Sequence, residues 1–531
     1  MTGAQRSVKR RALLISLTVL SCILSACLST PPPATKSAPT ATPLVVSTIT
    51  ATHLPALTTT PAPRLTTTPA HATLAVPTAF ASAYAGQMAQ LQQAQPGLRI
   101  EKVADSAAAA TRLQKRQAAW AVIESTQPIT AARLLCSTPY VPVVHFSSPL
   151  EDVSMQRLQA IYQGKDWQGQ VFYSGDTAML RRLLDIQALG SQARALASWK
   201  EVIERVAGDR TALAYVPWAE VDARVKTLSL DGRSIAVNGI QGYGYGGGWW
   251  LVAGSNVSMA TGDAIARSLA CPISEPVTFL AGGDILMGWY VHDLYIKQHG
   301  PEYLFRRIRD LIRSADIAFA NVENPLTTHD VSGYLKFRAA PEAAKGLTYA
   351  GIDVVNLANN HIGDAGTQGL LNTIDTLRQN GITYVGVGRN RAEARSSWIT
   401  TTKGIKVAIL AYNDIGIEPG YFAATDARPG MAWIEPDNVY AEIKRAKAQA
   451  DFVIASFHWG VEYTPHPTSR QRDIARRAAE AGAGMIIGHH PHVVQGVGFF
   501  GPVFVNYSIG DFVYSQPTRP ATGEGIILRA V

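Results

Sequence analysis

The chain has 531 residues, of which 47% are hydrophobic and 17% are charged, and its formal net charge is +8. This length excludes a single ordinary core, and the composition is that of a globular protein with at least two domains. The charge does not indicate a nucleic-acid partner, because seven Lys and Arg residues precede Glu101, the first acidic residue. The rest of the chain is close to neutral, so we expect no polyanion-binding surface.

The N-terminus has the features of a targeting signal. RSVKRR is cationic, ALLISLTVLSCILSA is apolar, and Leu24-Ser25-Ala26-Cys27 follows. This tetrapeptide resembles the bacterial lipobox. The resemblance implies that residues 1–27 are a signal peptide and that a lipid on Cys27 anchors the protein to the outer face of the membrane. An uncleaved signal anchor is the alternative, and both predict an extracytoplasmic protein.

Residues 28–77 consist mainly of Thr, Pro and Ala and contain almost no charge. Such a segment cannot bury enough apolar surface to offset its ordering entropy, so it is predicted to be a disordered tether. Beyond the signal only Cys136 and Cys271 remain, and in an oxidising compartment they are predicted to form a disulfide. Two separate buried thiols are the alternative.

Residues 78–272 alternate between helical and strand patterns. VPVVHFSSPLEDVSMQRLQAIYQGKDW and TALAYVPWAEVDARVKTLSLDG resemble the solute-binding proteins of phosphate transporters. The resemblance implies a periplasmic-binding-protein-like α/β domain. It supplies no ligand residues, because the phosphate-binding turns of that family are not recognisable. The stretch GYGYGGGWW (Gly242 to Trp250) lacks the lysine of a phosphate-binding loop and is predicted to be a turn that enters a strand.

From Pro276 onward, strand and helix patterns alternate and predict an α/β domain. The predicted strands are 277–281, 316–320, 353–357, 383–387, 407–412, 452–457, 485–487 and 503–507. The predicted helices are 302–313, 343–350, 366–379, 440–450 and 469–481.

Five of these strands are followed by polar groups that suit a metal or a phosphate. They are Asp284, then Glu323, then Asn360 with His361, then His458, then His490 with His492. Alone, an Asp after a strand is often a helix cap, a single His is more often structural, and the histidine-rich GHHPHVVQG could be a surface turn. Because the carboxyl ends of parallel strands share an edge, the recurrence predicts that the side chains converge there. Imidazole and carboxylate groups together favour a divalent metal.

The motifs GGDILMG, NVENPL, NLANNHIGDAG, FHWGVEY, GHHPHVVQG and YSIGDF span about residues 277 to 515. In this order they resemble the CapA (PgsA) capsule-synthesis family of poly-γ-glutamate producers, which is related to the calcineurin-like metallophosphoesterases. The resemblance implies that residues 273–531 form a four-layer αββα sandwich with two divalent metal ions, either Mn, Fe or Zn.

The same resemblance implies roles for individual residues. His361 would protonate the leaving oxygen. Apart from the resemblance, Arg338 in KFRAAP is a candidate to neutralise a substrate anion, with a solvated loop charge as the alternative. The implied metal ligands are Asp284, Glu323, Asn360, His458, His490 and His492, and the implied neighbours are Asn321, Asp364, His489 and Glu462. Three positions depart from the pattern: Leu286 replaces the usual His, Glu323 replaces the bridging Asp, and Asp511 stands where Asn is common.

Three functions follow as hypotheses. The first is a metal-dependent hydrolase that acts on a phosphoester, or on an amide or ester of a cell-envelope polymer, in capsule or poly-γ-glutamate biosynthesis. The second is a non-catalytic accessory of poly-γ-glutamate synthesis or export. The third is a solute sensor that uses the middle domain. The expected partners are the membrane, through the lipid, and poly-γ-glutamate or another envelope polymer with its synthesis complex; nucleic acid is not expected.

Overall fold

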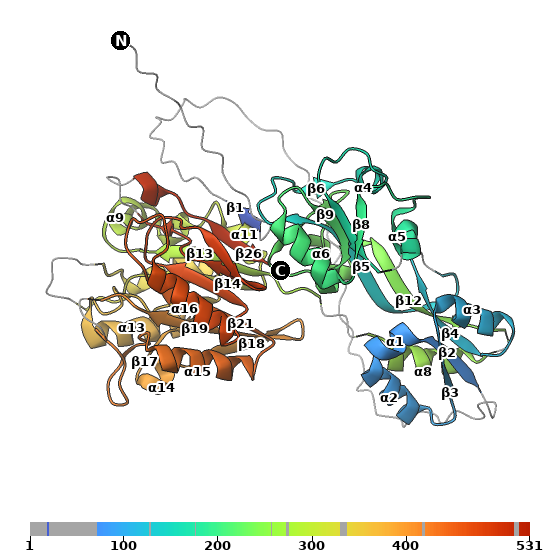
Figure 1. The fold of residues 1–531 in the computed structure, drawn as a ribbon. Helices are drawn as coiled ribbons and strands as arrows, with labels where there is room; N and C mark the ends of the chain where they lie inside the picture. Colours follow the sequence, from blue (N-terminus) through green and yellow to red (C-terminus); the bar gives the residue numbers. More distant parts are fainter. Residues whose placement is uncertain are drawn as a thin grey trace, which may run out of the picture. The chain divides into compact units, whose positions relative to one another are not determined.

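The computed structural model describes residues 18–20, 72–126, 129–175, 177–255, 257–271, 275–329, 337–416, 420–514 and 520–531 (Figure 1). Cys27 and most of the predicted signal and tether lie outside these ranges. Among the described residues, 72–123 and 251–269 form one compact unit, and 124–250 with 270–531 belong to another. No helix in the described ranges has the length and apolar character needed to cross a membrane.

The smaller unit is built on the parallel strands β3, β2 and β4. Strand β2 begins at Thr73, so the folded chain starts before residue 78, inside the segment predicted to be a tether. The physical reason is that Leu74 and Val76 are fully buried in β2, which pairs on both sides. The elements are β2 (Thr73–Pro77), α1 (Thr78–Ala83), α2 (Ala85–Ala94), β3 (Arg99–Val103), α3 (Ser106–Gln114), β4 (Trp120–Ser125) and α8 (Met259–Leu269).

Residues 124–250 form a mixed α/β region in which β5 pairs antiparallel with β9, and β9, β7 and β8 run parallel. Its core includes the fully buried Tyr162 and Tyr215. Cys136 and Cys271 form a disulfide. The elements are β5 (Arg133–His145), β6 (Asp152–Val153), α4 (Met155–Tyr162), β7 (Val171–Ser174), α5 (Thr177–Leu184), β8 (Ala193–Leu196), α6 (Trp199–Gly208), β9 (Leu213–Pro217), η1 (Trp218–Glu220), β10 (Val225–Thr227), β11 (Ser229–Leu230), α7 (Ile235–Tyr243) and β12 (Gly246–Ala253).

The C-terminal region contains two large sheets. In the first, the order is β1-β26-β13-β14-β15-β16, β25 also pairs with β13, and β13 to β16 run parallel. Strand β1 comes from the predicted signal segment and pairs with β26. The strands are β1 (Thr18–Leu20), β13 (Phe279–Ile285), β14 (Ile317–Val322), β15 (Val354–Asn356), β16 (Thr383–Val385), β25 (Asp511–Val513) and β26 (Ile527–Ala530).

The second sheet has the order β18-β19-β21-β22-β24-β23, and β19, β21, β22 and β24 run parallel. Its strands are β18 (Trp398–Thr402), β19 (Ile405–Asn413), β21 (Phe452–His458), β22 (Met485–His489), β23 (Val497–Phe500) and β24 (Val503–Asn506), and β17 (Val387–Gly388) pairs separately with β20 (Gly430–Met431). The helices of the region are α9 (Trp289–Val291), η2 (His292–Ile296), α10 (Lys297–His299), η3 (Pro301–Leu304), α11 (Arg309–Arg313), η4 (Pro341–Ala343), α12 (Ala344–Ala350), α13 (Gly366–Gln379), α14 (Arg391–Ala394), α15 (Pro436–Lys447), α16 (Ser469–Glu480) and η5 (Pro520–Gly523).

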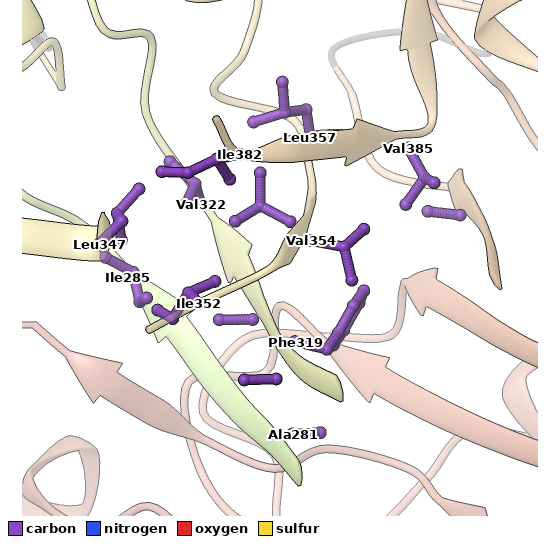
Figure 2. Packing of buried hydrophobic residues seen from close by; sticks show 14 of the residues in the cluster. Ala281, Ile285, Phe319, Val322, Leu347, Ile352, Val354, Leu357, Ile382 and Val385 are labelled. Carbon is purple, nitrogen blue, oxygen red and sulfur yellow. The ribbon is translucent and has the colours of Figure 1, made fainter. Parts of the chain in front are cut away.

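Alternation along β19 explains how the sheets pack. Val407, Ile409 and Ala411 belong to a core that also contains residues of the first sheet and of α12 and α13, including Phe319, Val354 and Leu347 (Figure 2). Ala408, Leu410 and Tyr412 belong to a second core with α15 and α16. Because successive side chains of a strand point to opposite faces, β19 joins both cores. These clusters fit the predicted four-layer arrangement.

Two expectations about this region are wrong. The helix predicted over 302–313 is broken into η3 and α11, because the fully buried Phe305 turns inward between them and contacts Phe512, with 6.1 Å between ring centroids. The strand predicted over 383–387 is interrupted at Gly386, whose φ is +85° and where a Cβ would lie 2.6 Å from the Cβ of Ala358.

A buried ion pair fixes α15 to the second sheet. Arg395 Nε donates to Glu442 Oε1 at 2.7 Å, and the Tyr412 hydroxyl donates to Glu442 Oε2 at 2.9 Å. Only 9% of each charged side chain is exposed. Removing Arg395 leaves Glu442 buried with only the exposed Arg445, whose Nη2 lies 3.7 Å from Oε1.

We predict that Arg395→Ala lowers the free energy of unfolding by about 3 kcal/mol, whereas Arg395→Met combined with Glu442→Leu recovers most of the loss. Arg391→Ala is the control, because its side chain is 45% exposed and lies 3.5 Å from Asp426, so a change below about 0.5 kcal/mol is expected. Urea unfolding measures the free energy of unfolding of the three variants. Equal losses of stability in Arg395→Ala and Arg391→Ala would contradict the prediction.

Candidate metal centre

The carboxyl ends of strands from both sheets supply the predicted site residues. In the first sheet Asp284 of β13 is in register with Asn321 of β14 and with Asp511 of β25. In the second, His458 of β21 is in register with His489 of β22. The sequence predicted one common sheet edge, and the structure instead brings together edges of two sheets, because the two sheets pack face to face over a shared core.

Asp284 is fully buried and surrounded by donors from both sheets. Its Oδ1 accepts from Asn321 Nδ2 at 2.8 Å and from His489 Nδ1 at 3.0 Å. Its Oδ2 accepts from the His490 backbone N–H at 3.2 Å and lies 3.5 Å from His492 Nδ1. A buried carboxylate needs such partners, since desolvation of an unpaired charge costs several kcal/mol.

Glu323 and His458 meet in the interior beside Asp284, and neither is exposed to solvent. His458 Nε2 lies 3.3 Å from Glu323 Oε1 and 2.6 Å from Asn360 Oδ1, while Glu323 Oε1 also lies 3.7 Å from His492 Nε2. His458 is therefore within contact distance of two other sequence-predicted ligands, Glu323 and Asn360, which follow different strands.

The turn after β22 holds His490 and His492 in left-handed backbone conformations, with φ of +94° and +56°. Such angles are uncommon outside glycine and concentrate at functional sites. His492 Nδ1 donates to Asp511 Oδ1 at 2.8 Å, and the His490 ring lies 4.9 Å from the ring of His458. The turn thus directs both imidazoles toward the carboxylates.

Burial and mutual charge set the protonation of the cluster. Burial lowers the pKa of His458 well below its ordinary value and that of His490 to about 3, which leaves both imidazoles in the neutral form that binds metals. Burial, reinforced by Asp284, raises the pKa of Glu323 well above its ordinary value. Burial would lower the pKa of His492, but the carboxylates around it, first Glu323, raise it well above the usual range.

The pKa values of Asp284 and Asp511 are shifted in opposite directions. Burial alone would raise the pKa of Asp284, but the hydrogen bond and charge of His489 hold it below its ordinary value. Burial raises the pKa of Asp511 to about 7, against the opposing hydrogen bond from His492. The cluster therefore concentrates carboxylates that lack enough cationic partners, a deficit that a divalent cation would fill.

The residues fit a metal on three overlapping sets of ligand atoms. The sets are Asp284, Glu323 and His458; Glu323, His490 and His492; and Asp284, His492 and Asp511, each with its atoms within 4.8 Å of one another. Glu323 Oε1, His490 Nδ1 and Asp511 Oδ2 are buried and have no hydrogen-bond partner among the residues that the structure describes. Buried polar atoms are rarely left unsatisfied, so these are the atoms that a cation would occupy.

Comparisons with known proteins find matches over the C-terminal region. Residues 278–516 match the family model described as bacterial capsule synthesis protein PGA_cap. The match includes every residue of the three candidate ligand sets. The chain is 33% identical over 253 residues to the capsule biosynthesis protein CapA of Bacillus anthracis, which covers 46% of this chain and 61% of that protein. It is 33% identical over 240 residues to the PGA biosynthesis protein CapA of Bacillus subtilis, and this match covers 44% of this chain and 62% of that protein. The match thus spans less than two thirds of these relatives.

Solved structures similar to part of the chain include an ABC-type phosphate transport receptor from Vibrio cholerae. That likeness covers 38% of this chain and 93% of the receptor, at 15% identity and a TM-score of 0.33. A putative phosphate ABC transporter substrate-binding protein from Clostridium perfringens is similar over 38% of this chain and 92% of its own, at 13% identity and a TM-score of 0.29.

Arg338 and Glu462, which were predicted to be neighbours of the site, belong to none of the ligand sets. Arg338 Nη1 donates to the backbone carbonyls of Thr328 and His329, at 2.8 and 2.7 Å. Glu462 is exposed. Asp511 was expected only as a departure from the family pattern, and the structure places it in a ligand set. The position of Asp511 shortly after the predicted strand 503–507 is the sequence feature that could have indicated it as a ligand.

Tyr514 is a neighbour of the site that the sequence did not indicate. Its ring stacks on His492, with 5.0 Å between centroids and 27° between planes. Tyr463, at φ +61°, lies on the same imidazole with 6.1 Å between centroids. These two rings lie beside His492 and shield it from water.

We predict that His458→Ala weakens manganese binding by at least about 10- to 100-fold, because it removes an imidazole from the buried ligand set. The measurement is calorimetric titration of manganese into metal-free protein, with circular dichroism to check folding. His299→Ala is the matched control, since that ring stacks on Tyr303 at 4.5 Å and contacts none of the cluster. Equal manganese binding by both variants would contradict the ligand assignment.

Proposed function

We propose that the chain is an extracytoplasmic, membrane-anchored protein of capsule or poly-γ-glutamate biosynthesis whose C-terminal domain is a metal-dependent hydrolase. Its substrate would be a phosphoester, or an amide or ester, of a cell-envelope polymer. The observation that carries the proposal is the sharing of ligands: Asp284, Glu323 and His492 each belong to two of the three candidate ligand sets. Shared ligands are what a pair of adjacent ions requires.

The donor set is one of carboxylate and imidazole groups, which suits Mn, Fe or Zn. A bound pair of such ions would supply Lewis-acid polarisation and would lower the pKa of water. Within the chain, Asn360 and Asn321 hold His458 and Asp284 by hydrogen bonds, so the ligands are positioned before a substrate arrives.

His361 has the position of a proton donor to the leaving group. Its Nδ1 contacts Asp364 Oδ2 at 3.0 Å, and its side chain is 16% exposed, so a substrate can reach the ring while Asp364 orients it. The edge of Phe337 packs on the ring at 4.4 Å. His361 directly follows Asn360, whose Oδ1 lies 2.6 Å from Nε2 of His458 in the ligand cluster. With Nδ1 held by Asp364, Nε2 is the atom that holds the transferable proton.

The location rests on the N-terminal features and on the relatives. LSAC at residues 24–27 provides the cysteine for a lipid anchor, the Thr- and Pro-rich segment after it provides reach, and the two CapA relatives are named for capsule and PGA biosynthesis. The partners of the domain would be poly-γ-glutamate or another envelope polymer and its synthesis complex.

We predict that His361→Ala lowers kcat of the manganese-loaded protein on a generic phosphoester by about 10²- to 10⁴-fold, with manganese content unchanged. Asp364→Asn should lower kcat by a smaller factor, because it only misorients the ring of His361. His299→Ala should retain full activity.

Absence of turnover by the wild-type protein with manganese, iron and zinc, together with normal polymer production in a His361→Ala strain, would contradict the hydrolase. That result would favour the accessory role in synthesis or export.

A further inference from the structure

An exposed pair of aromatic rings follows the first ligand strand. Trp289 and Tyr290 come five and six residues after Asp284, and they are 40% and 44% exposed. Their ring centroids are 4.3 Å apart, with 34° between planes. Large aromatic surface left in water beside a polar site is typical of a surface that binds a ligand.

These rings are connected to the proposed proton donor by direct packing. Trp289 meets Phe337 edge to face, with 5.4 Å between centroids, and Phe337 meets His361 edge to face, at 4.4 Å. A single ring therefore separates the exposed pair from His361.

The backbone fixes this placement. Met287 N–H donates to the buried Asn324 Oδ1 at 2.8 Å, and Gly288 approaches Arg338 so closely that a Cβ there would lie 2.4 Å from its carbonyl oxygen. Trp289 itself has φ of +50°, a left-handed conformation that is uncommon for a bulky residue. Such strain persists where surrounding contacts impose it, and it accompanies ligand clamps.

Charged groups of both signs occur in the segments around the rings. Asp293 is exposed four residues after Trp289, and Asp364 lies against His361. Arg338 donates to two uncharged backbone carbonyls and keeps its positive charge. An uncharged ring with a C–H face needs no counter-charge, so it packs on Trp289 without an electrostatic penalty.

We propose that Trp289 and Tyr290 form a stacking platform for a sugar ring, and that the substrate class is a sugar phosphoester whose ring lies on this platform. This inference rests on the proposed hydrolase function. In it Trp289 is a specificity-determining residue that touches the substrate beside His361, and Phe337 is a positioning residue between them.

The test compares glucose 6-phosphate with ethyl phosphate on the full manganese-loaded chain. Trp289→Gly removes the ring and relieves the left-handed strain, so it should fold. We expect it to raise KM for glucose 6-phosphate about 5- to 10-fold, with kcat within about twofold and KM for ethyl phosphate unchanged. Trp289→Phe should restore KM to within about threefold. Leu294→Ala, at a side chain 48% exposed in the same segment, should change neither constant.

Calorimetric binding of glucose 6-phosphate to the manganese-loaded protein separates this inference from the hydrolase. If the wild-type protein hydrolyses neither ester but Trp289→Gly binds the sugar phosphate about 5- to 10-fold more weakly, the hydrolase fails and the platform stands. Equal KM and Kd in wild type and Trp289→Gly would overturn the platform. A Trp289-dependent affinity for poly-γ-glutamate or for anionic phospholipid vesicles, without one for glucose 6-phosphate, would also overturn it.

Discussion

The buried carboxylate of Asp284 is the constraint on which the C-terminal domain depends. It accepts from Asn321 within its own sheet and from His489 and the backbone of His490, which come from the second sheet, and it faces His492. Because an unpaired charge in the interior is so costly, the two sheets can pack only in the register that brings these donors to it. Packing of the sheets and assembly of the site are therefore one event.

The cores explain why that register is well defined. The side chains of β19 alternate between the core shared by the sheets and the core beneath α15 and α16, so a slip by one residue would exchange both sets. Asn413 at the end of β19 is in register with His458, and His458 with His489. The hydrophobic pattern far from the site thus sets which imidazoles reach the carboxylates.

Much of this was predictable from the sequence. The helix over 366–379 and the strand ends that deliver Asp284, Glu323 and His458 follow from local periodicity and short apolar runs. The division of the strands between two sheets came only from the family resemblance, since periodicity carries no information about which strands pair. Strand β2 was missed because composition placed Thr73–Pro77 with the Thr- and Pro-rich segment, while burial between β3 and β4 decides its structure.

The remaining surprises at the site are long-range contacts. Asp511 joins a ligand set because β25 pairs with β13, and Phe337 reaches both His361 and Trp289 although 24 and 48 residues separate them along the chain. No local pattern predicts such neighbours, because each depends on the tertiary packing of distant segments.

The most direct test of the central claim is electron paramagnetic resonance of the manganese-loaded protein. The account predicts the exchange-coupled spectrum of two ions about 4 Å apart, and its loss in Asp284→Asn, because that carboxylate belongs to two of the ligand sets. A spectrum of one isolated ion that is unchanged in Asp284→Asn would contradict the shared centre.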